Sequence, residues 1–296
     1  MQTVPAKSIL SPYREYGWFA SNYTANLYRG CPHACIYCDS RSACYGIDDF
    51  SVVRAKENAL GVLERELSKK KRKGTILTGA MSDPYNPFER DQELTRGFLQ
   101  LADRYRFGVV AITKSDLVCR DADLFAAIGA HSPAAVNITI TAADDVLAKK
   151  IEPHVPRSSD RFHAIETLSA EDIVCGVILL PVLPFITDTK ENISAIVSRA
   201  AEAGAAFVYA EKHFAVSLRD RQRAYFYDRL DAYFPGLRER YEREFGDQYW
   251  CGSPDTGLWD FFARECEAAG ILWRHEEIDS LLSRQATDTQ STLFSP

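Results

Sequence analysis

Short apolar runs alternate with longer amphipathic stretches through the first two thirds of the chain. The runs are nearly continuous, as at residues 109–112 and 177–180, which is typical of parallel strands covered on both faces. Between them, apolar residues such as Ala59, Leu63 and Leu67 recur at helical spacing. The pattern predicts strands at residues 26–29, 75–79, 107–113, 135–141, 173–180 and 206–210. It predicts helices at residues 52–70, 93–105, 121–130, 144–150, 159–168 and 191–203, with Ser159 as the cap of the fifth.

Six strand–helix units predict an α/β fold built as a barrel or partial barrel. Strand signals fade after Lys212, and residues 218–234, 237–245 and 258–269 have helical patterns. We therefore divide the chain into a lead-in (residues 1–24), a barrel (25–212), a helical C-terminal extension (213–284) and a tail (285–296). The tail is rich in Thr, Ser and Gln and is expected to be frayed.

Composition limits the class of protein. Of the 296 residues, 46% are hydrophobic and 26% charged, which indicates a globular chain, and the net charge of −6 gives no bulk attraction for polyanions. The apolar run at residues 173–186 contains Pro181 and Pro184 and falls short of the roughly 20 residues of a membrane span. The first 13 residues lack the apolar segment of a signal peptide. These features predict a cytoplasmic protein with no membrane partner.

The cysteines are unevenly distributed. Five of the eight are scattered singly, whereas Cys31, Cys35 and Cys38 occupy one short loop with C-x3-C-x2-C spacing. In the absence of a signal peptide, we expect thiols or metal ligands and not disulfides. Gly30 and Pro32 allow the tight backbone that would let the three thiolates converge.

Three convergent thiolates favour an iron–sulfur cluster. A cubane normally takes four cysteines, so three leave one iron open to an exogenous ligand. A structural zinc site would need four ligands, usually as two pairs, and His33 lies inside the triplet where it could not easily complete a tetrahedron. A zinc site, or three unpaired buried thiols, are the alternatives.

This loop, with Tyr37 just before its third cysteine, resembles that of the radical S-adenosylmethionine enzymes. The resemblance implies a 4Fe–4S cluster on Cys31, Cys35 and Cys38 and S-adenosylmethionine bound at the open iron. It implies an electron from an external flavodoxin- or ferredoxin-type donor, which cleaves S-adenosylmethionine to methionine and a 5′-deoxyadenosyl radical. The usual fold of that superfamily is a partial (β/α)6 TIM-like barrel, in agreement with the unit count.

A closer resemblance covers about residues 26–275 and points to the spore photoproduct lyase-like branch, often described as DNA repair photolyase-like. It rests on the segments at residues 26–31, 82–87 with Glu89, 113–115, 120–121, 151–153 and 180–184. These segments are specific for the branch but not for the reaction. The substrate therefore stays open, with a nucleic-acid lesion, and hence DNA, as one candidate. The alternative function is a non-enzymatic iron–sulfur or zinc-binding protein.

The resemblance also implies a set of cofactor-binding residues: Tyr37, Ser82, Asp83, Lys114, Asn137 and Thr139. Ser82 and Asp83 follow the second strand, where the family contacts the amino group of S-adenosylmethionine. Lys114 directly follows the third strand, where a cation would neutralise the carboxylate. Asn137 and Thr139 share one face of the fourth strand. A turn before Pro84, a solvated lysine and a strand-forming threonine are the structural alternatives.

Two departures from the lyase pattern predict that spore photoproduct itself is not the substrate. The lyase donates hydrogen from a cysteine at the place that Met81 occupies here, and a thioether has no S–H bond to give. The lyase also carries tyrosines on both sides of its third cluster cysteine, whereas Asp39 replaces one here. Cys251 is a candidate substitute donor, and a small buried core residue is its other interpretation.

The segment at residues 219–241 interleaves arginines and tyrosines, including Arg219, Arg221, Arg223 and Tyr225. Such a pattern could bind a nucleic-acid backbone and stack on bases. It also fits an amphipathic helix that covers the barrel, and we favour this second interpretation.

Overall fold

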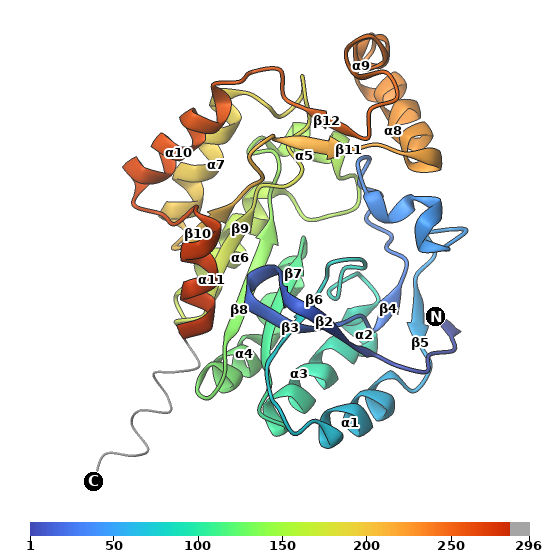
Figure 1. The fold of residues 1–296 in the computed structure, drawn as a ribbon, viewed down its shortest axis with the longest axis vertical. Helices are drawn as coiled ribbons and strands as arrows, with labels where there is room; N and C mark the ends of the chain where they lie inside the picture. The colour runs from blue at the N-terminus through green and yellow to red at the C-terminus, as the bar shows by residue number, and fades with distance from the viewer. Residues whose placement is uncertain (285–296) are drawn as a thin grey trace.

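The computed structural model describes residues 1–284, and its centre is a seven-stranded sheet (Figure 1). The strand order is β10-β9-β8-β7-β6-β3-β2. The strands are β2 (Leu10–Gly17), β3 (Ser21–Ala25), β6 (Thr75–Thr78), β7 (Gly108–Thr113), β8 (Ala134–Thr139), β9 (Val174–Ile178) and β10 (Phe207–Tyr209). All neighbours from β3 to β10 are parallel, and β2 pairs antiparallel with β3 at the edge.

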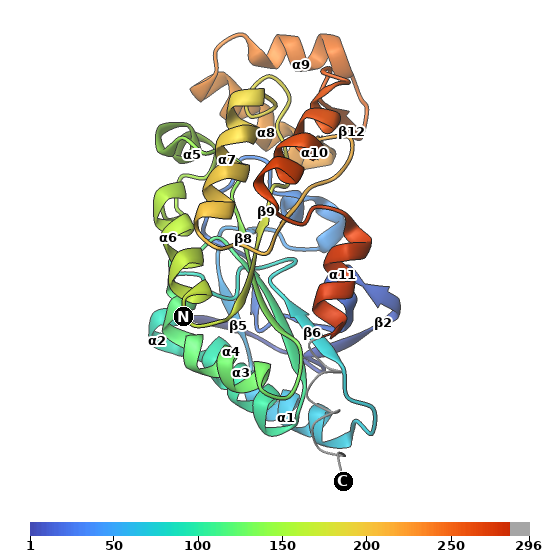
Figure 2. The same cartoon turned by 90° about the vertical axis from the view of Figure 1, so that its left-hand side faces the viewer.

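Six parallel strands in chain order form the predicted partial (β/α)6 barrel. Within residues 1–284, the sheet is open, because β2 and β10 are its two edge strands. The helices that follow the strands cover its outer face (Figure 2). They are α1 (Ala59–Lys69), α3 (Leu94–Arg104), α4 (Ala122–Gly129), α5 (Asp145–Ile151), α6 (Ser158–Ser169) and α7 (Lys190–Glu202). The largest apolar cluster lies between these helices and the strands.

The inner face of the sheet is filled from both ends of the chain. Phe19, in a single 3-10 turn between β2 and β3, packs in the interior against Phe207 and Tyr209 of β10. Ile278 and Leu282 of α11 (His275–Arg284) join the same buried cluster. The lead-in and the last described helix are thus part of the barrel core.

The C-terminal extension is helical, as predicted, but also contains a strand pair. Its helices are α8 (Asp220–Tyr233), α9 (Leu237–Phe245) and α10 (Leu258–Ala269), and α10 lies beside α7 (Figures 1 and 2). Strands β11 (Ala215–Ser217) and β12 (Trp250–Gly252) pair antiparallel. This pair was not predicted, since three-residue strands give too short a pattern to detect. Helix α11 (His275–Arg284) was not predicted as a separate element either.

Several boundaries differ from the prediction. The predicted helix at 52–70 divides into β5 (Arg54–Lys56) and α1, because Asn58 has a left-handed backbone (φ 47°) that separates them. β5 lies between β1 (Gln2–Val4) and β4 (Tyr28–Arg29) in a small second sheet. The first barrel strand is therefore β3, upstream of the predicted 26–29.

The predicted cap at Ser159 is wrong by two residues. Helix α6 begins at Ser158 with Arg157 as its N-cap. Ser158 is buried and donates to the Ala142 carbonyl at 2.6 Å, and Ser159 instead binds Asp145. The predicted frayed tail at 285–296 lies outside the described residues.

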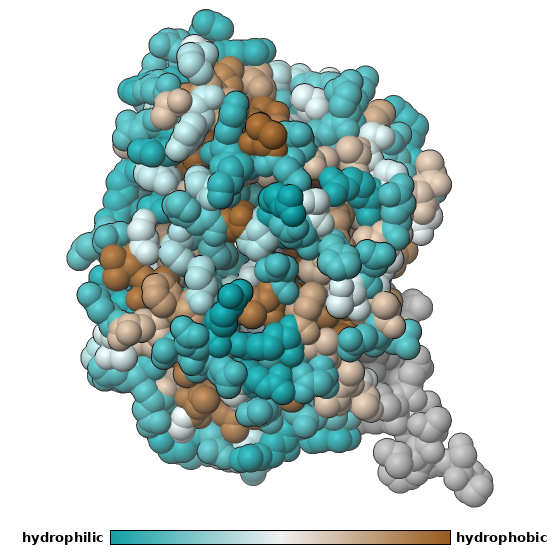
Figure 3. Space-filling model, turned by 180° about the vertical axis from the view of Figure 1, so that it is seen from behind, coloured by the Kyte–Doolittle hydropathy of each residue, from teal (hydrophilic) through white to brown (hydrophobic). Residues whose placement is uncertain are grey.

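The surface seen from behind is mostly hydrophilic, with small separate hydrophobic areas (Figure 3). No helix in the described part of the chain is long and apolar enough to cross a membrane.

Candidate active site

A cavity of about 350 Å³ lies where the barrel strands end. The cysteine loop forms one wall, and residues at the C-terminal ends of β7 and β8 and after β6 and β9 form another. The strand pair β11–β12 and the turn before β3 complete the lining. This is the C-terminal end of the parallel strands, the end at which barrel enzymes carry their active sites.

The cysteine loop is held by its backbone. Gly30 has φ +86°, and a Cβ there would lie 2.3 Å from the Val52 carbonyl oxygen, so only glycine fits. The Cys31 amide donates to the Phe50 carbonyl at 2.7 Å, and the Ile36 amide donates to the Ile151 carbonyl at 2.9 Å. The loop conformation is thus fixed by segments on both sides of it.

The three loop thiols line one cavity, as the spacing predicted. Cys35 is buried, whereas Cys31 and Cys38 are half-buried. Burial, reinforced by Asp83, raises the pKa of Cys31 to about 12, and burial likewise raises the pKa of Cys35 and Cys38. Deprotonating three such thiols needs a compensating positive centre, and a bound metal cluster is one.

The eight cysteines all fall within residues 1–284 and none forms a disulfide, as predicted. No three His, Cys, Asp or Glu side chains among the described residues converge tightly enough to hold a single metal ion. A cubane does not require that convergence, because each of its cysteine ligands binds a different iron atom.

Asp83 connects the cysteine loop to the ends of two strands. One carboxylate oxygen accepts from the Thr113 hydroxyl at 2.7 Å and from the Tyr85 amide at 2.8 Å. The other accepts from the Lys114 amide at 2.9 Å and lies 3.4 Å from His33 Nδ1. Asp83 therefore lines the cavity with both oxygens already engaged by this chain.

Ser82 is buried beside the cavity and is not among its lining residues. Its hydroxyl donates to the carbonyl of Gly30. The structure therefore gives Ser82 a bond that holds the cysteine loop, and the predicted contact to the cofactor would have to share that hydroxyl.

Lys114 lines the cavity directly after β7. Its ammonium nitrogen lies 5.7 Å from the centre of the Tyr37 ring. Burial alone would lower the pKa of Lys114, but the electrostatic influence of Cys35, Glu152 and Asp83 more than offsets this and raises the pKa. Lys114 is therefore a cation next to the thiols, where it also opposes the rise in pKa of Cys35 and Cys38.

The hydroxyl of Tyr37 is directed into a buried polar cluster. It donates to Glu152, whose other oxygen forms an ion pair with Arg161 at 2.6 Å. Arg161 also donates to the Thr139 carbonyl at 2.7 Å. From the sequence, Glu152 is both a member of the family segment at residues 151–153 and a candidate active-site residue, with a structural or solvated loop carboxylate as the alternative. Nothing in the neighbourhood of Arg161 marks it as buried, so the sequence does not reveal its role.

Asn137 and Thr139 lie on the inner face of β8, as the alternation predicted. Thr139 lines the cavity. Asn137 is fully buried two residues earlier, opposite Ile112 of β7 and Gly176 of β9. In the described part of the chain, neither polar atom of the Asn137 side chain has a hydrogen-bond partner. Such an orphaned amide is costly in a folded core.

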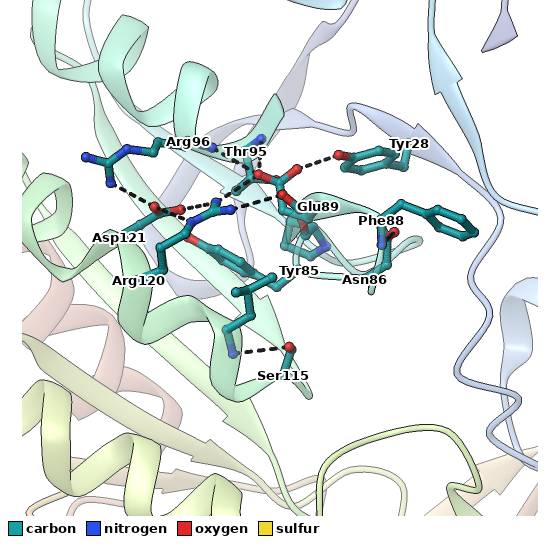
Figure 4. Close-up of polar contacts among 12 residues, drawn as sticks. Tyr28, Tyr85, Asn86, Phe88, Glu89, Thr95, Arg96, Ser115, Arg120 and Asp121 are labelled. Carbon is teal, nitrogen blue, oxygen red and sulfur yellow. Dashed lines mark hydrogen bonds and ion pairs between the residues drawn. The ribbon is translucent and has the colours of Figure 1, made fainter. Parts of the chain in front are cut away.

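The segment at residues 82–89 is held by a second buried network (Figure 4). Glu89 accepts from the hydroxyl of Tyr28 and forms an ion pair with Arg120 at 2.9 Å. Arg120 also binds Asp121 at 2.8 Å, and Arg96 approaches the same carboxylate at 2.9 Å. Both carboxylates are fully buried. The family segments singled out in the sequence thus contact one another and support the loop that carries Asp83.

The residues at the two departures from the lyase pattern, Met81 and Asp39, both line the cavity. Cys251 does not. It is buried on β12 in an apolar cluster with residues such as Phe226 and Tyr241, and burial raises the pKa of its thiol to about 11. Its position matches the alternative interpretation, a small core residue. Its neighbours Tyr249 and Trp250 face the cavity instead.

Helix α8 packs against the cysteine loop, as favoured for the arginine- and tyrosine-rich segment. The Gln222 amide donates to the Tyr37 carbonyl at 3.2 Å, and the Tyr225 hydroxyl donates to the Ala34 carbonyl at 3.4 Å. The Arg221 guanidinium binds the Arg41 carbonyl at 2.8 Å. These side chains are engaged within the protein.

Comparison with known proteins decides the family. A sequence model of the Radical SAM superfamily matches residues 25–195. The chain belongs to the Radical SAM superfamily. Membership in this superfamily implies an enzyme. The matched region contains the cysteine loop and β6 to β9 of the barrel.

Two relatives in sequence are named as uncharacterized proteins. An uncharacterized protein of Mycobacterium tuberculosis (strain H37Rv) is 31% identical over 245 residues, covering 80% of this chain and 71% of the relative. An uncharacterized protein of Methanocaldococcus jannaschii is 35% identical over 190 residues, covering 63% and 69% respectively.

Solved structures confirm the predicted resemblance at the level of the fold. A spore photoproduct lyase mutant with bound AdoMet and dinucleoside spore photoproduct aligns with a TM-score of 0.62 at 14% identity, covering 86% of this chain and 76% of that one. The radical S-adenosylmethionine methyltransferase TsrM of Kitasatospora setae, with its tryptophan substrate and a SAM analog, aligns at 0.55 and 15% identity, covering 83% and 51%. At these identities, the likeness extends to the fold and not to the substrate.

Proposed function

We propose that this Radical SAM protein binds one 4Fe–4S cluster through Cys31, Cys35 and Cys38 and uses it to cleave S-adenosylmethionine. The observation that carries the proposal is the position of three loop thiols and a half-buried lysine in one cavity at the active-site end of a partial barrel. When bound, the cluster supplies the electron that converts S-adenosylmethionine to methionine and a 5′-deoxyadenosyl radical.

The residues of this chain have separate tasks in the proposal. Lys114 neutralises the carboxylate of S-adenosylmethionine, because it is the lysine that lines the cavity beside the thiols. Thr139 and the orphaned amide of Asn137 offer hydrogen bonds from β8. Tyr37 contacts the cofactor through its ring and backbone, since its hydroxyl is engaged by Glu152. Asp83 holds the loop against β7 and takes part through its charge.

The electron comes from an external donor of the flavodoxin or ferredoxin type, and the radical abstracts hydrogen from an organic substrate. A nucleic-acid lesion other than spore photoproduct is the substrate class carried over from the family resemblance. Met81 supports the exclusion of spore photoproduct, because a thioether lines the cavity where the lyase has a hydrogen-donating thiol.

The test is anaerobic reconstitution with iron and sulfide, reduction with dithionite, and chromatography for 5′-deoxyadenosine. The proposal expects cluster-loaded protein to form 5′-deoxyadenosine even without substrate. Protein that takes up a cluster and S-adenosylmethionine without forming 5′-deoxyadenosine would support an iron–sulfur binding protein instead. Protein that takes up zinc in place of iron would support a zinc-binding protein.

A further inference from the structure

The rim of the cavity carries exposed aromatic side chains. Among described residues whose side chains are placed, seven large hydrophobic side chains are exposed, and three of them line this one cavity. They are Trp18 (51% exposed), Tyr249 (37%) and Trp250 (63%). Exposed indole rings leave apolar surface in water, which proteins tolerate mainly where something binds.

These rings come from opposite ends of the chain. Trp18 lies in the turn between β2 and β3, where the next two residues, Phe19 and Ala20, both have left-handed backbones (φ 56° and 52°). Phe19 is buried in the barrel, so the strained turn anchors one ring inside and leaves its neighbour at the cavity.

Trp250 owes its position to β12. It pairs with Ser217 of β11, and the next residue along the strand, Cys251, points to the opposite side into the core. Its neighbour Tyr249 packs edge-on against it at 4.7 Å between ring centroids. The Arg219 guanidinium lies 5.3 Å from the centre of the Tyr249 ring. Contacts within this chain thus hold the Tyr249–Trp250 pair in place.

Few cations of the described residues lie at the cavity. Lys114 is the only lysine or arginine among the described residues that line the cavity, and it lies beside the thiols. The nearby Arg219 is bound to Asp39 at 2.6 Å. A polyanionic strand would need unpaired cations at the rim, whereas an uncharged flat ring needs only aromatic faces.

We propose that Trp18 and Trp250 bind an uncharged planar aromatic ring of the substrate by stacking, with Tyr249 supporting Trp250. The inference rests on the proposed function for the identity of the site, and it adds the chemical class of the group presented to it. Two sources share this chemistry: the base of a nucleoside and the indole of a tryptophan derivative.

Calorimetric titration of the anaerobically reconstituted protein with S-adenosylmethionine present tests the proposal. The probes are thymidine, N-acetyltryptophanamide and 5,6-dihydrothymidine, whose ring is puckered and not aromatic. We expect saturable binding of thymidine or of N-acetyltryptophanamide, which identifies the source, and at least tenfold weaker binding of dihydrothymidine. Trp18→Ala and Trp250→Ala should each weaken binding about tenfold, since stacking on one aromatic side chain contributes a factor of this order.

Matched variants separate stacking from general damage. Trp18→Phe and Trp250→Phe should retain most of the affinity, and Trp259→Phe should change nothing, because Trp259 packs with Phe214 and Phe262. Unchanged affinity in the Trp18→Ala/Trp250→Ala double variant would overturn the proposal. So would the absence of saturable binding of both aromatic probes, or strongly salt-dependent binding of a thymidine oligonucleotide that the double variant retains.

The proposed function fails by a different readout. Substrate-free formation of 5′-deoxyadenosine by the wild-type protein tests the proposed function alone, because no ring probe is present in that assay. If the wild-type protein forms no 5′-deoxyadenosine, the proposed radical chemistry is refuted. If the Trp→Ala variants nevertheless lose probe binding, the proposal of a ring-binding site still holds.

Discussion

Arg161 and Glu152 form an ion pair, with 2.6 Å between Nη2 and Oε2, in a place where neither side chain is exposed. The same carboxylate accepts the hydroxyl of Tyr37, the residue before the third loop cysteine. The ion pair therefore stabilises the cysteine loop through Tyr37, and it links that loop to helix α6.

Replacing Glu152 with Gln should destabilise the apo-protein by about 3–5 kcal/mol, because it leaves the Arg161 charge buried and unpaired. Denaturant unfolding measures this loss. Glu166→Gln is the control, since Glu166 is exposed in its pair with His163, and it should cost less than about 1 kcal/mol. A Glu152→Gln variant as stable as that control would show that the pair contributes nothing.

The stability lost on replacing Glu152 with Gln should also depend on pH. Burial alone would raise the pKa of Glu152, but Arg161 and Lys114 hold it below its usual 4.5. A carboxyl whose pKa is lowered by folding stabilises the protein above its unfolded pKa, and this contribution disappears as the pH falls through the folded value. The gap between wild type and Glu152→Gln should thus be constant near neutral pH and narrow below about 4.5.

Cys31→Ala, Cys35→Ala and Cys38→Ala should each remove most of the iron and sulfide from reconstituted protein while circular dichroism stays that of a folded barrel. Each thiolate is assigned one iron, and no other cysteine lines the cavity in the described residues. Cys44→Ala, at an exposed cysteine, should keep full cluster content. Full cluster content after replacement of any one of the three cysteines would contradict the assignment.

Lys114→Met should weaken S-adenosylmethionine binding about tenfold or more and leave iron content nearly unchanged. A charge-assisted contact contributes about 1.5–3 kcal/mol, and the expected contact is to the cofactor carboxylate and not to iron. Equilibrium dialysis and iron analysis measure the two effects separately. Lys71→Met, at an exposed lysine, is the control, and equal losses of iron and of cofactor affinity would refute the role.

Asn137→Leu should raise the unfolding free energy of the apo-protein by about 1 kcal/mol, because it removes an unsatisfied buried amide from the core. The same change should lower the affinity for S-adenosylmethionine. Asn192→Leu should instead lower the unfolding free energy, because the Asn192 side chain forms hydrogen bonds with Ala143, Thr141 and Thr187. A destabilised Asn137→Leu variant with normal cofactor affinity would mean that the amide has only a structural role.

Wild-type protein should not convert DNA containing spore photoproduct to thymines over multiple turnovers, because Met81 has no hydrogen to return. Met81→Cys places a thiol in the same cavity wall and should raise conversion in an anaerobic assay with product chromatography. Cys251→Ala should leave the result unchanged, as Cys251 lies in the core. Efficient wild-type turnover that is lost in Cys251→Ala would show that spore photoproduct is a substrate and that Cys251 is the hydrogen donor.

The sequence contained the information for the barrel and the cysteine loop, because both depend on local patterns. Continuous apolar runs specify buried parallel strands, and the spacing of Cys31, Cys35 and Cys38 is short enough to read directly. Trp18 and Trp250 carry no such signal, since they are 232 positions apart and only the fold brings both to the same cavity. The burial of Arg161 was equally hidden, because an arginine in a polar helix segment is normally solvated.

Helix α8 binds the carbonyl of Tyr37 through Gln222, 185 positions later in the chain. During synthesis, the three loop cysteines therefore emerge long before the helix that covers them. Until about residue 225 has been made and folded back, the loop lacks that hydrogen bond. The packing of the cysteine loop against helix α8 is thus completed at a late stage of synthesis, after most of the chain has been translated.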